Sequence, residues 1–176
     1  IHVSGGNTIK RGSSMPAPGT SAAPHAHSSE EIKKHVNIPV ATVARINEPW
    51  MAEELIANGK CDMCMIGRPN LCDSEFANKA FEGKVDDIRP CIGCGRCLKG
   101  IMMGKRIGCT VNQSVEDDTI APAETKKKVL VIGGGPAGME AAYVAKKRGH
   151  EVVLCEKSNE LGGQLRLAAV PIAKQE

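Results

Sequence analysis

The first half of the chain alternates between short apolar runs and amphipathic stretches. Apolar, β-branched runs predict three strands, at 1–4, 39–44 and 62–66. Apolar residues at helical spacing predict three helices, at 30–36, 47–58 and 73–81. We expect Ser28 and Asn47 to cap the first two helices, and Gly59 and Gly83 to end the second and third. Because parallel neighbouring strands need a crossover between them, this order predicts parallel βα units.

The second half holds one more strand–helix–strand unit. It follows a polar linker at 117–128, whose closing lysines we interpret as a solvated approach to the next strand. The predicted elements are strands at 129–132 and 151–155 with a helix at 136–148 between them. Two segments lack a regular pattern, namely a long loop at 5–27 and the cysteine-rich stretch 91–109, which leaves little room for regular structure.

Composition excludes several classes of function. The 23 basic and 20 acidic side chains leave a net charge of +3, which suggests no polyanionic partner, and four aromatic residues are too few for a nucleic-acid stacking platform. No window approaches the roughly 20 apolar residues of a membrane span, and no signal peptide is visible. We therefore expect a reducing, cytoplasmic location, where the eight cysteines are metal ligands or buried thiols rather than disulfides.

Four cysteines form the strongest motif. Cys91, Cys94, Cys97 and Cys109 have the pattern C-x2-C-x2-C-x11-C, and four thiolates are the ligand set of a [4Fe-4S] cluster. Zinc also takes four thiolates, but its sites usually consist of two separate C-x2-C pairs. The backbone can turn tightly between the ligands, because Gly93 and Gly95 carry no Cβ.

The other four cysteines carry weaker signals. Cys61 and Cys64 are three residues apart in or beside a predicted strand, where residues at that spacing point to opposite faces, so we expect that they cannot hold one metal. Cys72 and Cys155 are expected to be small buried hydrophobic residues.

A glycine-rich turn lies between the predicted strand at 129–132 and the helix that follows it. Gly133, Gly135 and Gly138 form G-x-G-x-x-G, with Pro136 and Ala137 inside it, which predicts a dinucleotide site with the pyrophosphate at the helix N-terminus. Glu156, about 20 residues further on, is placed to accept a hydrogen bond from a ribose hydroxyl. FAD and NAD share this fingerprint, so the turn alone does not choose between them.

Two strand ends near the start of the chain share a pattern of small residues and arginine. Arg45 follows the strand at 39–44, and Gly67 and Arg68 follow the strand at 62–66. Phosphate sites of (β/α)8 barrels commonly lie after the last two strands, so these residues fit a phosphate site at the seventh and eighth strands. On the residues alone, an arginine at a strand end can equally well pair with a carboxylate.

Taken in order, these motifs resemble a known family. The runs V-A-T-V-A-R-I-N-E-P, D-M-C-M-I-G-R-P, D-S-E-F-A-N-K-A-F-E-G and C-I-G-C-G-R-C, followed by the glycine turn, are similar to the iron-sulfur flavoenzymes of the NADH:flavin oxidoreductase (Old Yellow Enzyme-like) family, from about Pro39 onward. Gly163 and Gln164 belong to L-G-G-Q, which is similar to the FAD-binding half of two-dinucleotide flavoproteins.

The resemblance implies a fold class and a domain order. It implies an α/β protein with the C-terminal part of an FMN-binding (β/α)8 barrel at 1–88, an iron-sulfur segment and linker at 89–125, and the start of a Rossmann-like FAD/NAD(P)-binding domain at 126–176. Arg45, Gly67 and Arg68 would then hold the FMN phosphate. We expect the chain to be a piece of a longer polypeptide, since about five barrel strands and the family's catalytic acid have no counterpart in it.

The resemblance also implies a function. Electrons would pass from NAD(P)H to FAD, to [4Fe-4S] and to FMN, which reduces an activated C=C bond of a small molecule in a parent protein that can be a homo-oligomer. Two alternatives stay open: an amine dehydrogenase that passes electrons outward, which the spacing of the cysteines favours, and a non-catalytic electron-transfer module stabilised by zinc or a cluster. None of His2, His25 and His27 aligns with the family's catalytic histidine, so the catalytic residue is unassigned.

Overall fold

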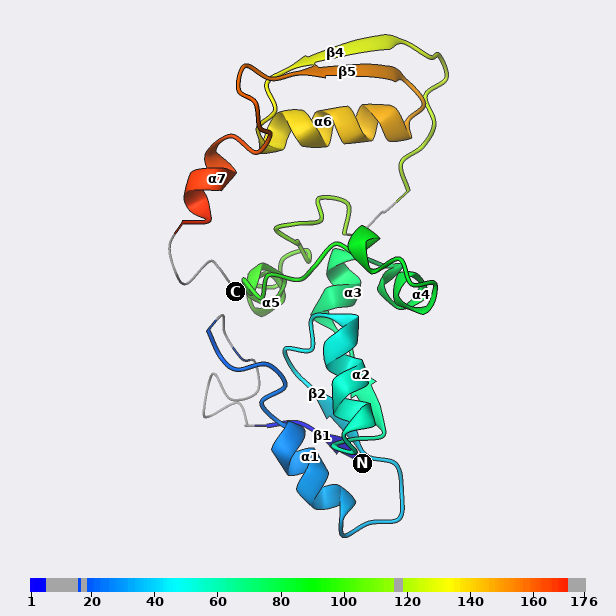
Figure 1. Cartoon of the computed structure of the whole chain (residues 1–176), viewed down its shortest axis with the longest axis vertical. Coiled ribbons are helices and arrows are strands. Elements are labelled where there is room, and N and C mark those ends of the chain that lie inside the picture. Colours follow the sequence, from blue (N-terminus) through cyan, green and yellow to red (C-terminus); the bar gives the residue numbers. More distant parts are fainter. Residues whose placement is uncertain (6–15, 17–18, 116–118, 171–176) are drawn as a thin grey trace. The chain divides into compact units, whose positions relative to one another are not determined.

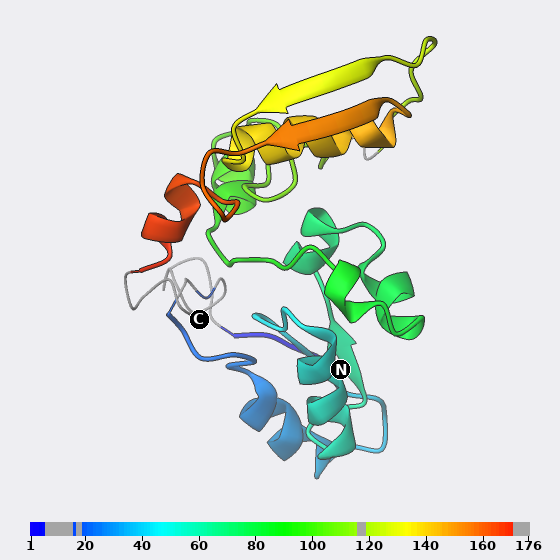
Figure 2. The same cartoon turned by 45° about the horizontal axis from the view of Figure 1, so that its top comes forward.

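The chain folds into two compact units, Ile1–Asp118 and Thr119–Glu176, in a computed structural model (Figures 1 and 2). The structure describes residues 1–5, 16, 19–115 and 119–170. Most of the long loop expected at 5–27, and the last residues of the chain, lie outside this described part. Each unit is considered by itself below.

The first unit is built on a three-stranded parallel sheet in the order β1–β2–β3. Its strands are β1 (His2–Val3), β2 (Ala41–Val43) and β3 (Met63–Met65). The register pairs His2 with Ala41 and Thr42 with Cys64. Helices α1 (Ala26–Lys33) and α2 (Pro49–Ala57) are the crossovers between these strands. The parallel βα units expected from the sequence are confirmed, with strands shorter than the apolar runs that predicted them.

The core of this unit lies between the sheet and the two crossover helices. It consists of the buried residues Ala26, Ile46, Leu55 and Cys61. Val40 and Thr42, at the start and middle of the second predicted strand, are fully buried. Asp62 fixes the edge of this core, because its carboxylate pairs with Lys33 of α1 and accepts the backbone N–H of Val40 at 2.9 Å.

The predicted caps of both crossover helices are wrong. Helix α1 begins at Ala26, so Ser28 lies inside it and is exposed; the N-cap is His25, whose ring accepts the backbone N–H of Gly5 at 3.1 Å. Helix α2 has Glu48 rather than Asn47 at its N-cap, with Pro49 at the first position. Neither N-cap makes a side-chain hydrogen bond to its helix, so packing of the helices on the sheet decides where they begin.

Four short elements follow β3. They are α3 (Arg68–Cys72), α4 (Phe76–Phe81), the 3₁₀ helix η1 (Val85–Asp87) and α5 (Arg96–Met102). The helix expected at 73–81 starts later, at Phe76, and ends at Phe81 as expected, because Asp73 is extended (φ −144°, ψ 108°); α3, which precedes it, was not predicted. The expectation of little regular structure at 91–109 is also wrong, since α5 starts immediately after Gly95, which has a left-handed φ of 74°.

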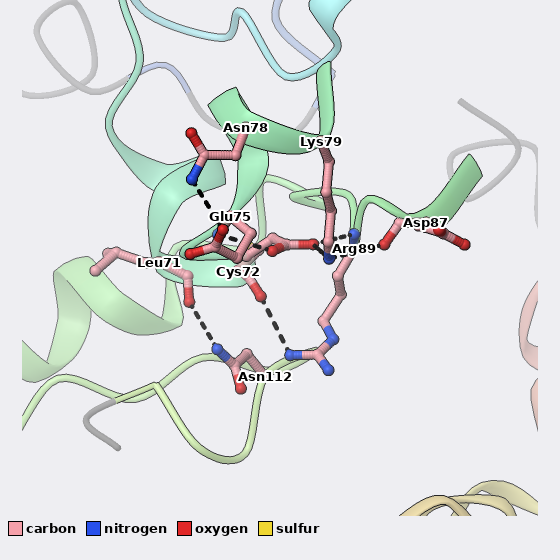
Figure 3. A network of polar contacts seen from close by, with 9 residues as sticks. Leu71, Cys72, Glu75, Asn78, Lys79, Asp87, Arg89 and Asn112 are labelled. Carbon is pink, nitrogen blue, oxygen red and sulfur yellow. Dashed lines mark hydrogen bonds and ion pairs between the residues drawn. The ribbon is translucent and has the colours of Figure 1, made fainter. Parts of the chain in front are cut away.

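The buried carboxylate of Asp73 joins the end of α3 to α4 and to the chain after η1, and its partners Glu75, Lys79 and Arg89 are labelled in Figure 3. It accepts hydrogen bonds from the Lys79 ammonium (2.6 Å), from the backbone N–H of Arg89 (3.0 Å) and from the backbone N–H of Glu75 (3.0 Å). Burial alone would raise the pKa of Asp73, but these three donors outweigh it and lower the pKa below the ordinary value. The carboxylate is therefore charged in the folded protein, and both of its oxygens accept hydrogen bonds.

The second unit is a parallel βαβ element. Strands β4 (Lys128–Ile132) and β5 (Glu151–Cys155) pair in register, with Val129 opposite Val152, and α6 (Pro136–Lys147) covers one face of the pair (Figure 1). A short helix, α7 (Gln164–Ala168), ends the described part. The predicted strands and helix are confirmed here to within a residue.

The face of the second sheet that α6 does not cover is apolar and exposed. Leu130, Ile132 and Val153 lie there in the alternating pattern of the two strands. Cys155 lies on the same exposed face as these residues, so the expectation that it is a buried residue is wrong.

The closing lysines of the linker are exposed, as expected. None of the helices among the described residues combines the length and apolar character needed to cross a bilayer.

We predict that Asp73→Asn lowers the free energy of unfolding at about pH 7 by about 1–3 kcal/mol, because three donors lose their anionic partner. The pKa of Asp73 is lowered by folding, so its contribution is complete above the unfolded pKa of about 3.9 and is lost as the pH falls through the folded value. The gap between the variant and the wild type should therefore narrow in acid. Urea denaturation of both proteins at about pH 7 and in acid measures this gap in the free energy of unfolding. A gap independent of pH would contradict the role of the charged carboxylate.

Candidate functional site

A pocket opens where β2 and β3 end. It has a volume of about 180 Å³ and is lined by Arg45 after β2 and by Gly67 and Arg68 after β3. In a parallel sheet, the carboxyl ends of neighbouring strands meet at one edge, and ligands of α/β proteins bind at this edge. The structure thus brings the three predicted phosphate-site residues to one pocket, while the FMN phosphate itself stays a prediction.

The backbone at this pocket is strained. Ala44 (φ 84°) and Arg45 (φ 47°) are both left-handed, a conformation that is costly for residues with a Cβ. Because two such residues follow β2 in succession, the chain bends sharply at the pocket wall. Nothing in the residue types of 43–46 predicted this conformation, which is set by the way β2 connects to α2.

Two further residues line the same pocket from distant parts of the chain, Pro16 from the long loop and Leu98 from α5. Nothing in the sequence predicted that either residue lies at this pocket. Leu98 is important because α5 belongs to the cysteine segment, so the wall of the phosphate-site pocket is partly made by that segment.

The four motif cysteines line a second pocket of the first unit. Cys91, Cys94, Cys97 and Cys109 all contribute to it. Gly93 (φ 65°) and Gly95 (φ 74°) are left-handed, as the tight turns between the ligands require, and Cys97 is buried in the first turns of α5. The predicted cysteines are thus brought together, and their thiols are the donor set that a [4Fe-4S] cluster takes.

The arrangement of these thiols bears on which metal centre fits them. Within the described residues, no three side chains of His, Cys, Asp or Glu converge so as to hold a single metal ion. Tetrahedral zinc needs four sulfurs at about 2.3 Å from one point. A cubane binds each thiolate through a different iron atom, so its ligands surround a small volume instead of meeting at a point. All four cysteines line one pocket, and the choice between zinc and a cluster there stays a prediction.

The surroundings of Cys94 favour the thiolate form of its side chain. Burial would raise the pKa of its thiol, but the Thr110 hydroxyl, 3.1 Å from the Cys94 sulfur, and the backbone N–H and charge of Arg96 outweigh burial and lower the pKa. Since the thiolate is the form that binds metals, this environment suits a ligand.

A fifth cysteine lies at the same pocket. Cys72, the last residue of α3, is buried, and its sulfur lies 3.6 Å from that of Cys109. Burial and the nearby Cys91 and Cys109 raise the pKa of the Cys72 thiol. The expectation of a buried Cys72 is confirmed, but its place at the cysteine pocket was missed, because 36 residues lie between it and Cys109 in the sequence.

Arg68 lines both pockets of the first unit. It is the first residue of α3, whose last residue is Cys72. Helix α3 therefore runs from the phosphate-site pocket to the cysteine pocket.

Cys61 and Cys64 form a separate thiol pair, with their sulfurs 3.8 Å apart. The expectation that they point to opposite faces is wrong, because β3 begins at Met63 and Cys61 lies before it, where strand alternation does not apply. Burial raises the pKa of Cys64 to about 12, with Cys61 adding to the shift. Cys61 belongs to the core of the first unit, and Cys64 packs against that core.

The glycine turn of the second unit has the geometry its sequence predicts. Gly133 is left-handed (φ 104°) and donates its N–H to the carbonyl of Cys155 at 2.7 Å, which ties the turn to the end of β5. A Cβ on Gly138 would lie 1.9 Å from the Gly133 carbonyl oxygen, so only glycine allows this close approach of helix and turn. Gly135 is the N-cap of α6, and Pro136 and Ala137 form its first turn.

Two further predicted residues lie against this turn. Glu156 accepts the backbone N–H of Ser158 at 2.9 Å and that of Gly134 at 2.6 Å, and these bonds lower its pKa. Gly163 (φ 52°) packs on the turn, since a Cβ there would lie 3.2 Å from the Cα of Gly135, and Gln164 begins α7. Glu156 therefore has a second role, bracing the turn, beside the ribose contact that stays a prediction.

Parallel βα units, the pocket of Arg45, Gly67 and Arg68, a four-cysteine pocket and a G-x-G-x-x-G turn are together typical of flavin-dependent redox proteins. The comparisons with known proteins agree. Residues 9–87 match the NADH:flavin oxidoreductase / NADH oxidase family, and residues 128–174 match the FAD dependent oxidoreductases. The chain belongs to this family of flavin oxidoreductases, with one segment of each type.

Named relatives cover the chain but extend beyond it. The chain is 48% identical over 152 residues to an NADH oxidase of Thermoanaerobacter brockii, which covers 83% of the chain and 23% of the relative. It is 45% identical to a bilirubin reductase of Mediterraneibacter gnavus over all of the chain and 28% of the relative. The structure of 6-hydroxypseudooxynicotine amine oxidase from Pseudomonas geniculata N1 matches with a TM-score of 0.84 at 31% identity, over 94% of the chain and 26% of that protein. The chain thus spans about a quarter of the length of these relatives.

Substitutions of Gly135 and Gly138 should separate a binding role from a structural one. Gly138→Ala should destabilise the second unit by about 1–3 kcal/mol, because the new Cβ meets backbone. Gly135→Ala meets no atom within 4 Å and should leave stability unchanged. It should nevertheless lower FAD affinity about tenfold or more by keeping the pyrophosphate away from the backbone. Thermal unfolding and FAD titration of both variants test this. Unchanged FAD affinity in Gly135→Ala would argue against pyrophosphate at this turn.

Proposed function

We propose that the polypeptide carrying this chain is an NAD(P)H-dependent flavin oxidoreductase. Electrons would pass from NAD(P)H through FAD at the glycine turn and a [4Fe-4S] cluster at the four cysteines to FMN at the pocket of Arg45, Gly67 and Arg68. The three-stranded parallel sheet is then part of a (β/α)8 barrel, and the second unit is the start of a Rossmann-like domain. Bound flavins supply hydride and one-electron chemistry, and a cluster supplies one-electron transfer between them.

One observation carries this proposal. The phosphate-site pocket and the cysteine pocket share Arg68, and Leu98 of the cysteine segment forms part of the phosphate-site wall. A flavin phosphate and an electron carrier would therefore be neighbours within one folded unit. A zinc-stabilised structural module has no need of this proximity to a phosphate site.

The role of this chain's own residues is to bind and orient. Arg45 and Arg68 bring positive charge to a phosphate, and the strained backbone at 44–45 holds the first of them at the pocket wall. The four cysteines provide thiolates, with Cys94 favoured as an anion by Thr110 and Arg96. In the second unit, a Cβ on Gly135 would meet no atom within 4 Å, and this open space supports a pyrophosphate at the turn.

For the substrate, we propose an activated C=C bond, with an amine as the second candidate. The similarity to a bilirubin reductase supports the first, and the similarity to an amine oxidase of known structure supports the second. The two differ in the direction of electron flow. Anaerobic mixing with NADH and a cinnamate-type enoate, and separately with a secondary amine and a dye acceptor, distinguishes them: turnover in the amine assay alone would reverse the proposed direction.

We predict that the complete polypeptide, purified without oxygen, contains about four iron and four acid-labile sulfide per chain. Cys94→Ala and Cys97→Ala should lose this iron and the NADH-driven reduction of the substrate, because the electrons have no route between the flavins. Cys155→Ala is the control, since Cys155 is exposed at the end of β5 and does not line the cysteine pocket. Full turnover in an iron-free variant would refute the relay, and zinc in place of iron would refute the cluster.

A second prediction concerns the FMN pocket. Arg45→Gln should weaken FMN binding about 10- to 100-fold, which is the effect of losing one charged hydrogen bond to phosphate. Arg148→Gln is the matched control, because Arg148 belongs to the second unit. Fluorescence titration of the flavin-free protein with FMN gives the affinities. Equal affinity in the two variants would contradict the phosphate assignment.

A further inference from the structure

We propose that Cys72 is a positioning residue for the cysteine centre, whose S–H donates a hydrogen bond to the Cys109 sulfur and thereby raises the reduction potential of the cluster. This inference rests on the proposed function, since it requires a cluster at the four cysteines. It adds a fifth cysteine that the ligand motif does not include.

The geometry of the five sulfurs carries the first step. Cys72 lines the same pocket as the four motif cysteines, its side chain is 3% exposed, and its sulfur lies 3.6 Å from that of Cys109. This separation is within hydrogen-bonding range for sulfur. Because four thiolates complete the ligand set of a cubane, the fifth sulfur is left with its proton.

The second step is the way in which Cys72 is held in place. The Arg89 guanidinium donates to the carbonyl of Cys72 at 3.3 Å, and the Asn112 amide donates to the carbonyl of Leu71 at 3.2 Å (Figure 3). Arg89 lies two residues before Cys91, and Asn112 lies three residues after Cys109. Both ends of the cysteine segment are therefore bound to the last two residues of α3, and Cys72 is fixed between them.

These two anchors are themselves constrained. Asn112 is 2% exposed, and its side-chain oxygen accepts the backbone N–H of Ser114 at 2.9 Å. The backbone N–H of Arg89 donates to the buried carboxylate of Asp73, the residue next to Cys72. The contact between Cys72 and Cys109 is thus part of a network with fixed partners, which distinguishes it from a chance approach of two flexible side chains.

The third step is the effect on the cluster. Reduction adds one negative charge to the cluster and its thiolates, so a hydrogen-bond donor at a ligand sulfur stabilises the reduced state more than the oxidised state. A thiol is a weak donor, but burial removes the competing water. Cys72 should therefore make the cluster easier to reduce.

The experiment compares three variants of the complete polypeptide under anaerobic conditions. Cys72→Ala removes the donor, and Cys72→Ser replaces it with a hydroxyl donor. Cys61→Ala is the matched control, because Cys61 is equally buried and has a thiol neighbour at 3.8 Å but does not line the cysteine pocket. Iron and sulfide content is measured first, and the midpoint potential is then obtained from a redox titration followed by electron paramagnetic resonance.

We expect all three variants to keep the iron content of the wild type. The midpoint potential should shift downward in Cys72→Ala, return toward the wild-type value in Cys72→Ser, and stay unchanged in Cys61→Ala. Loss of iron in both Cys72 variants would make Cys72 a ligand and overturn the positioning role. An unchanged potential in iron-replete Cys72→Ala would overturn the inference alone, whereas a wild-type protein without iron would overturn the proposed function.

Discussion

The charged carboxylate of Asp73, buried at the end of α3, holds together the part of the chain on which both pockets of the first unit depend. A buried carboxylate is tolerated only when donors surround it, and Lys79, Arg89 and Glu75 supply them. Glu75 and Lys79 belong to the N-cap and body of α4, and Arg89 belongs to the chain after η1. Because these stretches are too short to bury a core of their own, this polar network, together with the carbonyl contacts of Arg89 and Asn112, determines where the cysteine segment lies.

This construction explains how a segment that buries few of its apolar side chains can present thiols in defined positions. The sheet and its two crossover helices bury the apolar residues, and α3 leads from the end of β3 toward the cysteines. Arg68, which lines both pockets, and Cys72, which lines the cysteine pocket, are the two ends of one short helix, so a rigid element connects the two pockets. If loops alone connected the two pockets, their separation would vary with the flexibility of the chain.

Residue patterns predicted the parts of this structure that depend on local chemistry. The βα order, the glycine turn and the four-cysteine motif were all readable, because strand alternation, a close helix–turn approach and thiolate ligation each need particular residues at particular spacings. The parts that depend on tertiary contacts were missed. Cys72 lies far from Cys109 in sequence, α5 has no strong helical pattern, and the left-handed Ala44 carries no signal in its residue type. The caps at Ser28 and Asn47 failed for the same reason, since packing on the sheet outweighed a local hydrogen bond.

The presence of Arg68 in the walls of both pockets has a thermodynamic consequence. Arg68 brings its positive charge to both pockets, so an anion bound in one pocket changes the electrostatic potential in the other. Coupling free energies are reciprocal. If an anion in the phosphate-site pocket changes the charge state of the cysteine pocket, then the charge state of the cysteine pocket must change the affinity for that anion by the same free energy.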